Sequence, residues 1–318
     1  MRNGGRAADG DTKNMKRNIR QTLFPLLAAM IWGAAFSAQS LCSAHLGPFT
    51  INTLRFFIAF LVLLPVCLLR RRGGWGTWRD ILLGSLCSGA ALFAASNAQQ
   101  FGLGSGASAG KAGFITALYI VLVPIAGVFT KKKSSVRLWL AVAVAVAGMY
   151  FLCISDGFSV ALSDLCLLAC AVLFTAQILA VDYFVRKVDG FVLSCGQFLV
   201  ASLLSSIFLF TGETVTGEGL LACLWPLLYI AVFSSCVGYT LQILAQKDGN
   251  PVLVSLLLSL ESFFAAVFGA LLLHERLTGR ELLGCGLMVA AIILAELPAR
   301  TGRKGGKSVP PQAEEPMR

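Results

Sequence analysis

Residues 250–296 read NPVLVSLLLSLESFFAAVFGALLLHERLTGRELLGCGLMVAAIILAE, two apolar runs separated by the short charged segment HERLTGRE. The hydrocarbon core of a bilayer is about 30 Å thick, so a helix needs roughly 20 apolar residues to cross it. Backbone groups in lipid must form their hydrogen bonds within their own segment. The stretch therefore predicts two membrane-spanning helices joined by a tight turn.

The same pattern extends over the 318-residue chain, in which 57% of the residues are hydrophobic and 13% are charged. This composition, with a mean hydropathy of +0.77, excludes an ordinary water-soluble globule. We predict an all-α integral membrane protein of ten transmembrane helices. They are expected at residues 22–41, 48–69, 80–101, 108–129, 136–154, 163–184, 191–211, 222–246, 251–273 and 279–297. The polar segments 1–21 and 298–318 are predicted to be disordered tails.

Positive charge predicts the orientation of these helices, because Lys and Arg resist translocation. If the N-terminus is cytoplasmic, Arg276 and Arg280 are the only basic residues in the outer loops. Both termini are then cytoplasmic, and the protein is expected to cross the cytoplasmic (plasma) membrane several times. The net charge of +10 lies in short clusters between apolar runs. We therefore expect no nucleic-acid partner.

An offset of 143 residues places the first five predicted helices on the last five without gaps. Matched positions include Gln99 with Gln242 and Arg137 with Arg280. Because five is an odd number, the second half must cross the membrane in the opposite sense. The sequence thus predicts two inverted five-helix repeats, residues 22–154 and 155–297, an architecture common among secondary transporters.

The chain resembles the EamA family of the drug/metabolite transporter (DMT) superfamily. The resemblance lies in IWGAAF (31–36), in QQFGLGSGASAGKAGFITALYIVLVPIAGVFTKKKSSVRLWLAVAVAVAGMYFL (99–152) and in the opening stretch 250–296. It covers about residues 22–297 and departs from internal symmetry where Lys132 or Lys133 stands opposite Glu275. The resemblance implies a transporter of a small solute. It does not identify the solute, because related proteins carry amino acids, nucleosides, cofactors and drugs.

Three ionisable residues fall inside predicted helices, where a charge needs a partner or a water-filled cavity. Glu261 is expected near the midplane, as a proton-coupling or cation-binding carboxylate or as one partner of a structural ion pair with Arg55 or Lys111. Arg55 is expected to bind an anionic group of the solute, or else an acid of helix 251–273 or backbone carbonyls. Lys111 faces the same cavity or extends to the outer headgroups.

Uncharged polar and aromatic residues form a second group of candidates. The amides and the tyrosine either orient the solute or tighten the bundle by hydrogen bonds between helices; they are Asn97, Gln99, Gln100, Gln177, Gln197, Tyr239 and Gln242. The aromatic residues either stack on the solute or pack against lipid; they are Trp32, Tyr119, Phe263, Phe264 and Phe268. Pro65 and Pro124 are expected to kink their helices, as hinges or as static bends.

The sequence thus favours a secondary permease that moves a small metabolite or drug by alternating access, driven by protons or by exchange. The residues expected to bind the solute are Arg55, Asn97, Gln100, Lys111, Tyr119, Tyr239 and Gln242, with Glu261 as the coupling residue. The alternative is a membrane receptor or accessory protein that transports nothing. An enzyme is disfavoured, because the sequence contains no recognisable catalytic set or phosphate-binding motif. The expected partners are the lipid bilayer and a small-molecule substrate, without a cofactor or metal; formation of a homodimer is left open.

Overall fold

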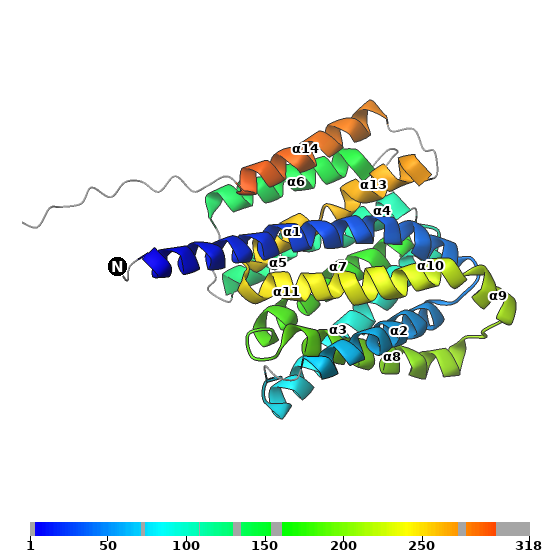
Figure 1. Ribbon diagram of the computed structural model, residues 1–318. Helices are drawn as coiled ribbons and strands as arrows, with labels where there is room; N and C mark the ends of the chain where they lie inside the picture. The colour runs from blue at the N-terminus through cyan, green and yellow to red at the C-terminus, as the bar shows by residue number, and fades with distance from the viewer. Residues whose placement is uncertain are drawn as a thin grey trace, which may run out of the picture.

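The computed structural model describes residues 4–70, 74–107, 109–129, 135–153, 161–272 and 278–296, and every regular element in these ranges is a helix (Figure 1). In chain order the helices are α1 (Gly4–Ser43), α2 (Pro48–Leu69), α3 (Trp78–Gly104), α4 (Ala109–Thr116), α5 (Tyr119–Phe129), α6 (Val136–Cys153), α7 (Leu162–Phe184), α8 (Gly190–Gly212), α9 (Gly217–Ala222), α10 (Leu224–Tyr229), the π-helix η2 (Ile230–Tyr239), α11 (Thr240–Asp248), α12 (Pro251–Leu258), α13 (Glu261–Leu272) and α14 (Gly279–Glu296).

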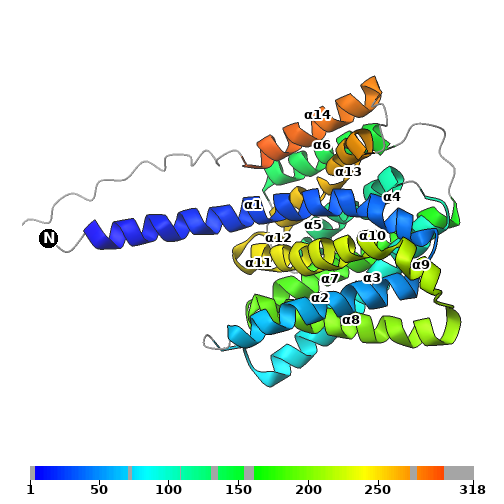
Figure 2. The same cartoon turned by 45° about the vertical axis from the view of Figure 1, so that its right-hand side comes forward.

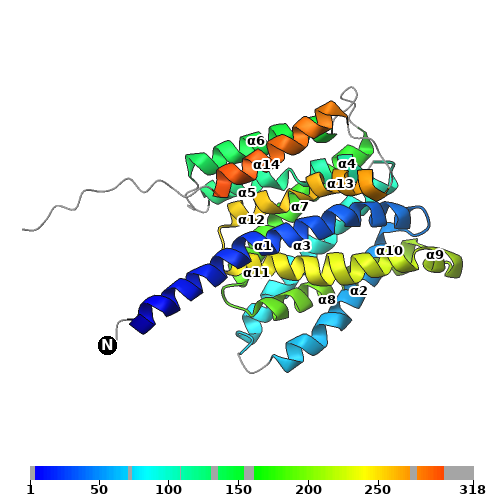
Figure 3. The same cartoon turned by 45° about the horizontal axis from the view of Figure 1, so that its top comes forward.

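Within the described residues, eight helical segments are long and apolar enough to cross a membrane. Two shorter apolar helices, Val136–Gly148 and Leu282–Ala295, correspond to the fifth and tenth predicted crossings. These two helices pack against each other as α6 and α14, and they lie together at one edge of the molecule in all three views (Figures 1 to 3). A count of ten crossings remains a prediction.

The N-terminal segment differs from its predicted disorder, because α1 begins at Gly4 and extends well before residue 22. Figure 2 shows its first turns projecting beyond the other helices. The apolar part of α1 begins only at Arg20. The preceding residues mix good helix formers, such as Ala, Lys and Arg, with Gly, Asp and Asn, and they continue a helix that the apolar part has already nucleated. The predicted C-terminal tail lies outside the described residues.

The fourth and ninth predicted helices are each interrupted in the middle. The chain leaves regular helix at Ala117–Leu118 in one and at Ser259–Leu260 in the other, positions that the 143-residue offset matches to within one residue. At both breaks a backbone N–H donates to the carbonyl three residues earlier, as in a 3₁₀ turn: Leu118 to Ile115 and Leu260 to Leu257. Pro65 and Pro124, the predicted kinks, lie inside the unbroken helices α2 and α5.

Serine hydroxyls explain the second interruption. Ser255 donates to the carbonyl of Val252 at 2.9 Å, and Ser259 donates to the carbonyl of Leu256 at 2.7 Å. Such bonds from a side chain to a nearby carbonyl compete with the helical ladder and bend the chain.

Contacts between the first and second halves of the chain come in matched pairs. The helices α2 and α8 pack together, as do α6 and α14, and both pairs join equivalent positions of the two halves. The packing of α3 on α7 has its counterpart in the packing of η2 and α11 on α1. The same holds for α4 on α7 and α12 on α1, and for α5 on α7 and α13 on α1. Such reciprocal contacts are expected if the two halves are related by a two-fold axis.

One end of the bundle, here called the Glu213 end, is closed by a carboxylate on a helix terminus. Glu213 accepts hydrogen bonds from the backbone N–H groups of Phe49 (2.9 Å) and Thr50 (2.7 Å) and from the Thr50 hydroxyl (2.6 Å). A negative charge is favoured at a helix N-terminus, whose first N–H groups have no partner in the helix. Glu213 therefore ties the end of α8 to the start of α2.

The opposite end, here called the Lys187 end, is closed by the equivalent segments through different contacts, a cation on an aromatic ring and a backbone hydrogen bond. The guanidinium of Arg70 lies 4.6 Å from the centre of the Phe191 ring, and the offset pairs Arg70 with Glu213. The backbone N–H of Asp189 donates to the carbonyl of Trp75 at 3.1 Å. Gly76, at a φ of 102°, comes so close to Lys187 that a Cβ would lie 2.5 Å from its carbonyl oxygen. At each end of the bundle, segments from the two halves are thus in contact in this conformation.

Candidate functional site

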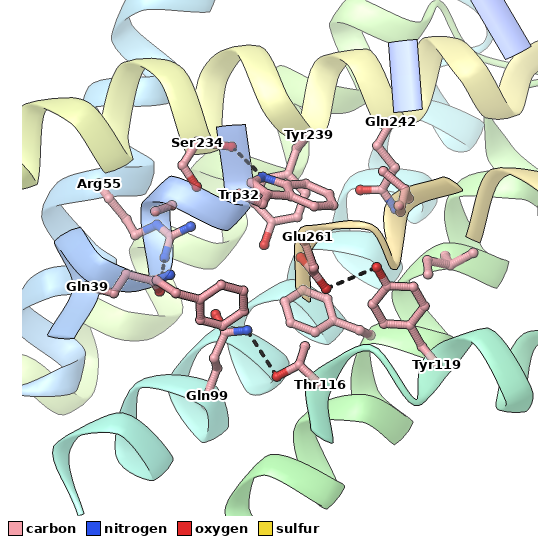
Figure 4. Close-up of a pocket in the computed structure, with 15 residues that line it drawn as sticks. Trp32, Gln39, Arg55, Gln99, Thr116, Tyr119, Ser234, Tyr239, Gln242 and Glu261 are labelled. Atoms are coloured by element: carbon pink, nitrogen blue, oxygen red, sulfur yellow. Dashed lines mark hydrogen bonds between the residues drawn. The ribbon is translucent and has the colours of Figure 1, made fainter. Parts of the chain in front are cut away.

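A cavity lies between the two halves, next to both helix interruptions (Figure 4). The space within it is about 30 Å³, enough for one or two water molecules. Side chains from both halves form its wall: Trp32, Ala35, Phe36, Gln39, Arg55, Gln99, Thr116, Tyr119, Phe174, Ile178, Ser234, Tyr239, Gln242, Leu258 and Glu261.

The two interruptions bring Tyr119 and Glu261 together. Tyr119 is the first residue of α5 and Glu261 the first residue of α13. The Tyr119 hydroxyl donates to Oε1 of Glu261 at 3.1 Å, as Figure 4 shows. Glu261 is 4% exposed, and no cationic side chain of the described residues lies within ion-pair distance of it. Since a buried carboxylate is costly without a partner, Glu261 is placed to bind a proton or a cationic group.

Arg55 reaches the same cavity from α2 and is 2% exposed. Its Nε donates to the hydroxyl of Ser235 and one terminal nitrogen donates to Oε1 of Gln39, both at 2.9 Å. The guanidinium also lies 4.9 Å from the centre of the Phe56 ring. All of these partners are neutral. The predicted ion pair between Arg55 and Glu261 is therefore not formed, although both side chains line one cavity.

Aromatic rings form one wall of the cavity around Tyr239. The ring of Trp32 lies 4.9 Å from that of Tyr239, and the ring of Phe174 lies 6.4 Å from it. The indole Nε1 of Trp32 donates to the carbonyl of Ser234 at 2.9 Å. That carbonyl belongs to η2, and π-helical turns often occur at functional sites. Gly238 makes room for the indole, because a Cβ there would lie 2.5 Å from Nε1.

Two glutamines present amides at the cavity from equivalent positions of the halves. Gln99 on α3 donates to the hydroxyl of Thr116 at 3.3 Å. Gln242 on α11 donates to Oε1 of Gln177 at 3.0 Å. The two glutamines that the 143-residue offset matches in the sequence thus line the same cavity.

Lys111 was wrongly predicted to face this cavity. Its ammonium pairs with the Asp164 carboxylate at 2.8 Å, and its side chain is 37% exposed. Lys111 is near the start of α4 and Asp164 near the start of α7, so the pair joins two helices near the Glu213 end. The predicted pairing of Lys111 with Glu261 is also wrong, because the acid on α7 is closer.

Asn97 and Gln100 are likewise absent from the cavity wall, contrary to prediction. Asn97 accepts from Asn52 at 3.0 Å and donates to Ser205 at 3.2 Å, and thereby joins α3 to α2 and α8. Gln100 donates to the carbonyl of Gln39 at 3.1 Å and thereby joins α3 to α1. Adjacent residues of a helix point about 100° apart, so Gln99 faces the cavity while Gln100 faces α1.

Five polar or aromatic lining residues are not among the sequence-predicted candidates: Phe36, Gln39, Thr116, Phe174 and Ser234. Gln39 carries a usable signal, a large amide inside an apolar helix. The other four are small or common residue types, and no sequence pattern separates them from ordinary packing. Of the five selected aromatic residues, Trp32 and Tyr119 line the cavity, whereas Phe263 and Phe264 pack against the apolar core.

Comparison with known proteins relates the chain to membrane transporters. The model of the EamA-like transporter family matches residues 21–154 and again residues 161–297. An uncharacterized transporter from Archaeoglobus fulgidus is 33% identical over 295 residues, 91% of this chain and 89% of that protein. An uncharacterized transporter from Synechocystis is 23% identical over 301 residues, 87% of this chain and 90% of that protein.

Among solved structures, a crystal structure with 21% identity superposes with a TM-score of 0.70, over 87% of this chain and 96% of that one. At this identity the likeness shows the fold alone. The two family matches together cover most of the chain. This chain therefore belongs to the EamA-like transporter family, within the drug/metabolite transporter superfamily.

Proposed function

We propose that this protein is a secondary transporter that moves a small solute by alternating access between two inverted five-helix repeats. The observation that carries the proposal is the cavity at the two matched helix interruptions, lined by both halves and holding a buried carboxylate. Discontinuous helices that meet near the middle of the membrane are a recurrent feature of transporter binding sites. The reciprocal contacts between the halves support the inverted repeat.

The solute is proposed to bind between Arg55, Glu261, Gln99, Gln242 and the ring of Tyr239. A space of about 30 Å³ is too small for a metabolite, so the walls must separate for the solute to enter. The contacts at the Glu213 end and at the Lys187 end are the ones that must break. Opening one end while the other stays closed is alternating access.

Glu261 is proposed to couple transport to protons. It competes for a proton or for a cationic group of the solute, because its only hydrogen-bond partner among the described residues is the Tyr119 hydroxyl. Arg55 keeps its charge among neutral partners and is proposed to receive an anionic or electron-rich group of the solute. The cavity then offers one acidic and one basic contact.

The Lys187 end is proposed to face the cytoplasm. The basic side chains of Arg70, Arg186 and Lys187 gather there, and the positive-inside rule assigns such an end to the cytoplasmic side. Both termini are then cytoplasmic, and the membrane is proposed to be the plasma membrane.

Two experiments test this function. Metabolite levels are compared inside and outside cells that lack or overproduce the protein, which identifies the solute class and the direction of transport. Transport of that solute into proteoliposomes is then measured across a range of pH for the wild type, for Glu261→Gln and for Glu218→Gln, an exposed acid on α9.

We expect Glu261→Gln to lose the pH dependence, because an amide cannot bind the coupling proton. Glu218→Gln should retain it. Transport by Glu261→Gln with the wild-type pH profile contradicts the coupling role. If no solute changes in the cells and none is transported by the vesicles, the transporter assignment itself is wrong.

A further inference from the structure

Four glutamines form a buried cluster between α7, α8 and α11, and each is at most 2% exposed. Gln242 donates to Gln177 at 3.0 Å, and Gln177 donates to Gln197 at 3.1 Å. Gln246, one turn along α11 from Gln242, donates to the carbonyl of Ile178 at 3.1 Å. Only Gln242 lines the cavity. The cluster therefore extends from the cavity wall into the interior of the protein.

Three amide atoms of this cluster have no hydrogen-bond partner among the described residues: Nε2 of Gln197, Oε1 of Gln242 and Oε1 of Gln246. Leaving such a buried group unsatisfied is costly, because it loses the hydrogen bonds that water makes with it in the unfolded chain. Within a protein surrounded by lipid, polar groups of this kind are found next to other polar groups or water-filled space. A cluster with three unsatisfied atoms points to a ligand with hydrogen-bonding groups.

The chemistry of the three atoms selects the ligand. A metal cation satisfies acceptors alone, and an anion satisfies donors alone. The cluster presents two acceptors and one donor, and water both donates and accepts. The nitrogen and oxygen of the linked amides of Gln242, Gln177 and Gln197 can also be assigned the other way round. Gln242 then has a free donor and Gln197 a free acceptor, so the cluster still presents both donors and acceptors.

The cluster leads toward the Lys187 end. Gln246 lies one turn beyond Gln242, and its partner Ile178 lies one turn before Asp182 on α7. Asp182 is 4% exposed, and its carboxylate contacts Arg186 at 3.1 Å, whose side chain is 54% exposed. Polar groups therefore follow one another from the cavity to the surface along α7 and α11.

The other half of the molecule lacks this arrangement. The 143-residue offset matches Gln177, Gln197 and Gln246 with Ala34, Leu54 and Leu103. The cluster is thus not a consequence of the repeat.

We propose that the four glutamines bind a short chain of water molecules that connects the cavity with the Lys187 end and carries protons to Glu261. The proton-carrying part rests on the coupling role proposed above. The water-binding part rests on the cluster alone. The two parts are tested separately, so that failure of one is distinguishable from failure of the other.

Hydration is tested on protein labelled with ¹⁵N-glutamine in membranes and transferred to D₂O. The side-chain amides of Gln197 and Gln246 are identified from the signals lost in Gln197→Leu and Gln246→Leu. If water occupies the cluster, both amides exchange while the backbone N–H groups of α11, bonded within the helix, remain protonated. Exchange no faster than that of those backbone groups overturns the proposal.

Proton delivery is tested by infrared spectroscopy after a rapid pH change, with the carboxyl band that disappears in Glu261→Gln as the signal. We expect protonation to slow about tenfold in Gln246→Leu, which corresponds to a barrier raised by about 1.4 kcal/mol. Gln197→Leu repeats the test should Gln246→Leu fail to fold. Gln100→Leu, a buried glutamine outside the path, should keep the wild-type rate.

An unchanged rate in both path variants overturns the proton path. Absence of any Glu261 band across the pH range instead contradicts the coupling role of Glu261, and amide exchange then decides the water-binding site by itself.

Discussion

At the scale of single residues, the cavity depends on small side chains that let large ones approach the backbone. Gly238 lets the indole of Trp32 reach the carbonyl of Ser234. Gly33 lets α1 approach α13, because a Cβ there would lie 2.5 Å from the Cβ of Phe264. Neither glycine has a positive φ, so each is required by the close contact and not by its backbone conformation.

Gly238→Ala is expected to destabilise the protein by about 1–3 kcal/mol, because the indole must move and its hydrogen bond to Ser234 is lost. Thermal unfolding in detergent measures the change. Gly286→Ala on α14 is the control, since a Cβ there meets no atom within 4 Å. This control should be neutral or slightly stabilising, as Ala favours helix over Gly. Equal melting temperatures for wild type and Gly238→Ala would show that the contact is dispensable.

At the scale of elements, the interruptions and the closed ends have different roles. The interruptions place the starts of α5 and α13 at the cavity, where Tyr119 and Glu261 meet. The ends hold α2 and α8 together, through Glu213 at one end and through Arg70 on Phe191 at the other. Equivalent positions thus make a contact of three hydrogen bonds at one end and a contact with an aromatic ring at the other.

Glu213→Ala is expected to loosen the Glu213 end, because it removes all three hydrogen bonds to the start of α2. Cys42 and Cys223 lie at this end and are fully buried, so their alkylation by a maleimide reports the opening. We expect both thiols to react faster in Glu213→Ala, as read from the modified peptides by mass spectrometry. Glu218→Ala, a change of an exposed acid on α9, serves as control. Wild-type reaction rates in Glu213→Ala would mean that Glu213 does not hold this end closed.

At the scale of the whole molecule, the proposed inverted repeat predicts on which side of the membrane equivalent positions lie. The 143-residue offset matches Ser135 with Thr278, and both are exposed. If the halves cross the membrane in opposite senses, these positions face opposite compartments. In the proposed orientation we expect Ser135 on the cytoplasmic side and Thr278 on the outside.

Ser135→Cys and Thr278→Cys are therefore expected to react with a membrane-impermeant maleimide from opposite sides of intact cells. The modified peptides identify each site, since the native thiols are also present. Thr278→Cys should react in intact cells, and Ser135→Cys only after the cells are opened. Reaction of both positions from one side excludes the inverted repeat.

Sequence reasoning identified several of the residues that line the cavity. Arg55, Tyr239, Gln242 and Glu261 were selected because polar groups are costly inside a membrane, and Tyr119 because its ring can stack on a solute. All five line the cavity. Which partner each one has was not predictable. Arg55 has Gln39 and Ser235, and Lys111 has Asp164. Partners depend on helix rotation, and a rotation of one residue separates Gln99 in the cavity from Gln100 at α1.

The sequence alone determined that the chain is helical and belongs in a membrane, because long apolar runs can satisfy their backbone groups in lipid only as helices. It also revealed the internal offset, since spacing is preserved where residue identity is lost. Only the tertiary structure decided where the helices break, that η2 is a π-helix, and that a carboxylate and a guanidinium share one cavity without touching. The last of these features depends on contacts between segments more than 100 residues apart, such as Tyr119 with Glu261 and Arg55 with Ser235. Local patterns of hydrophobicity carry no information about such contacts.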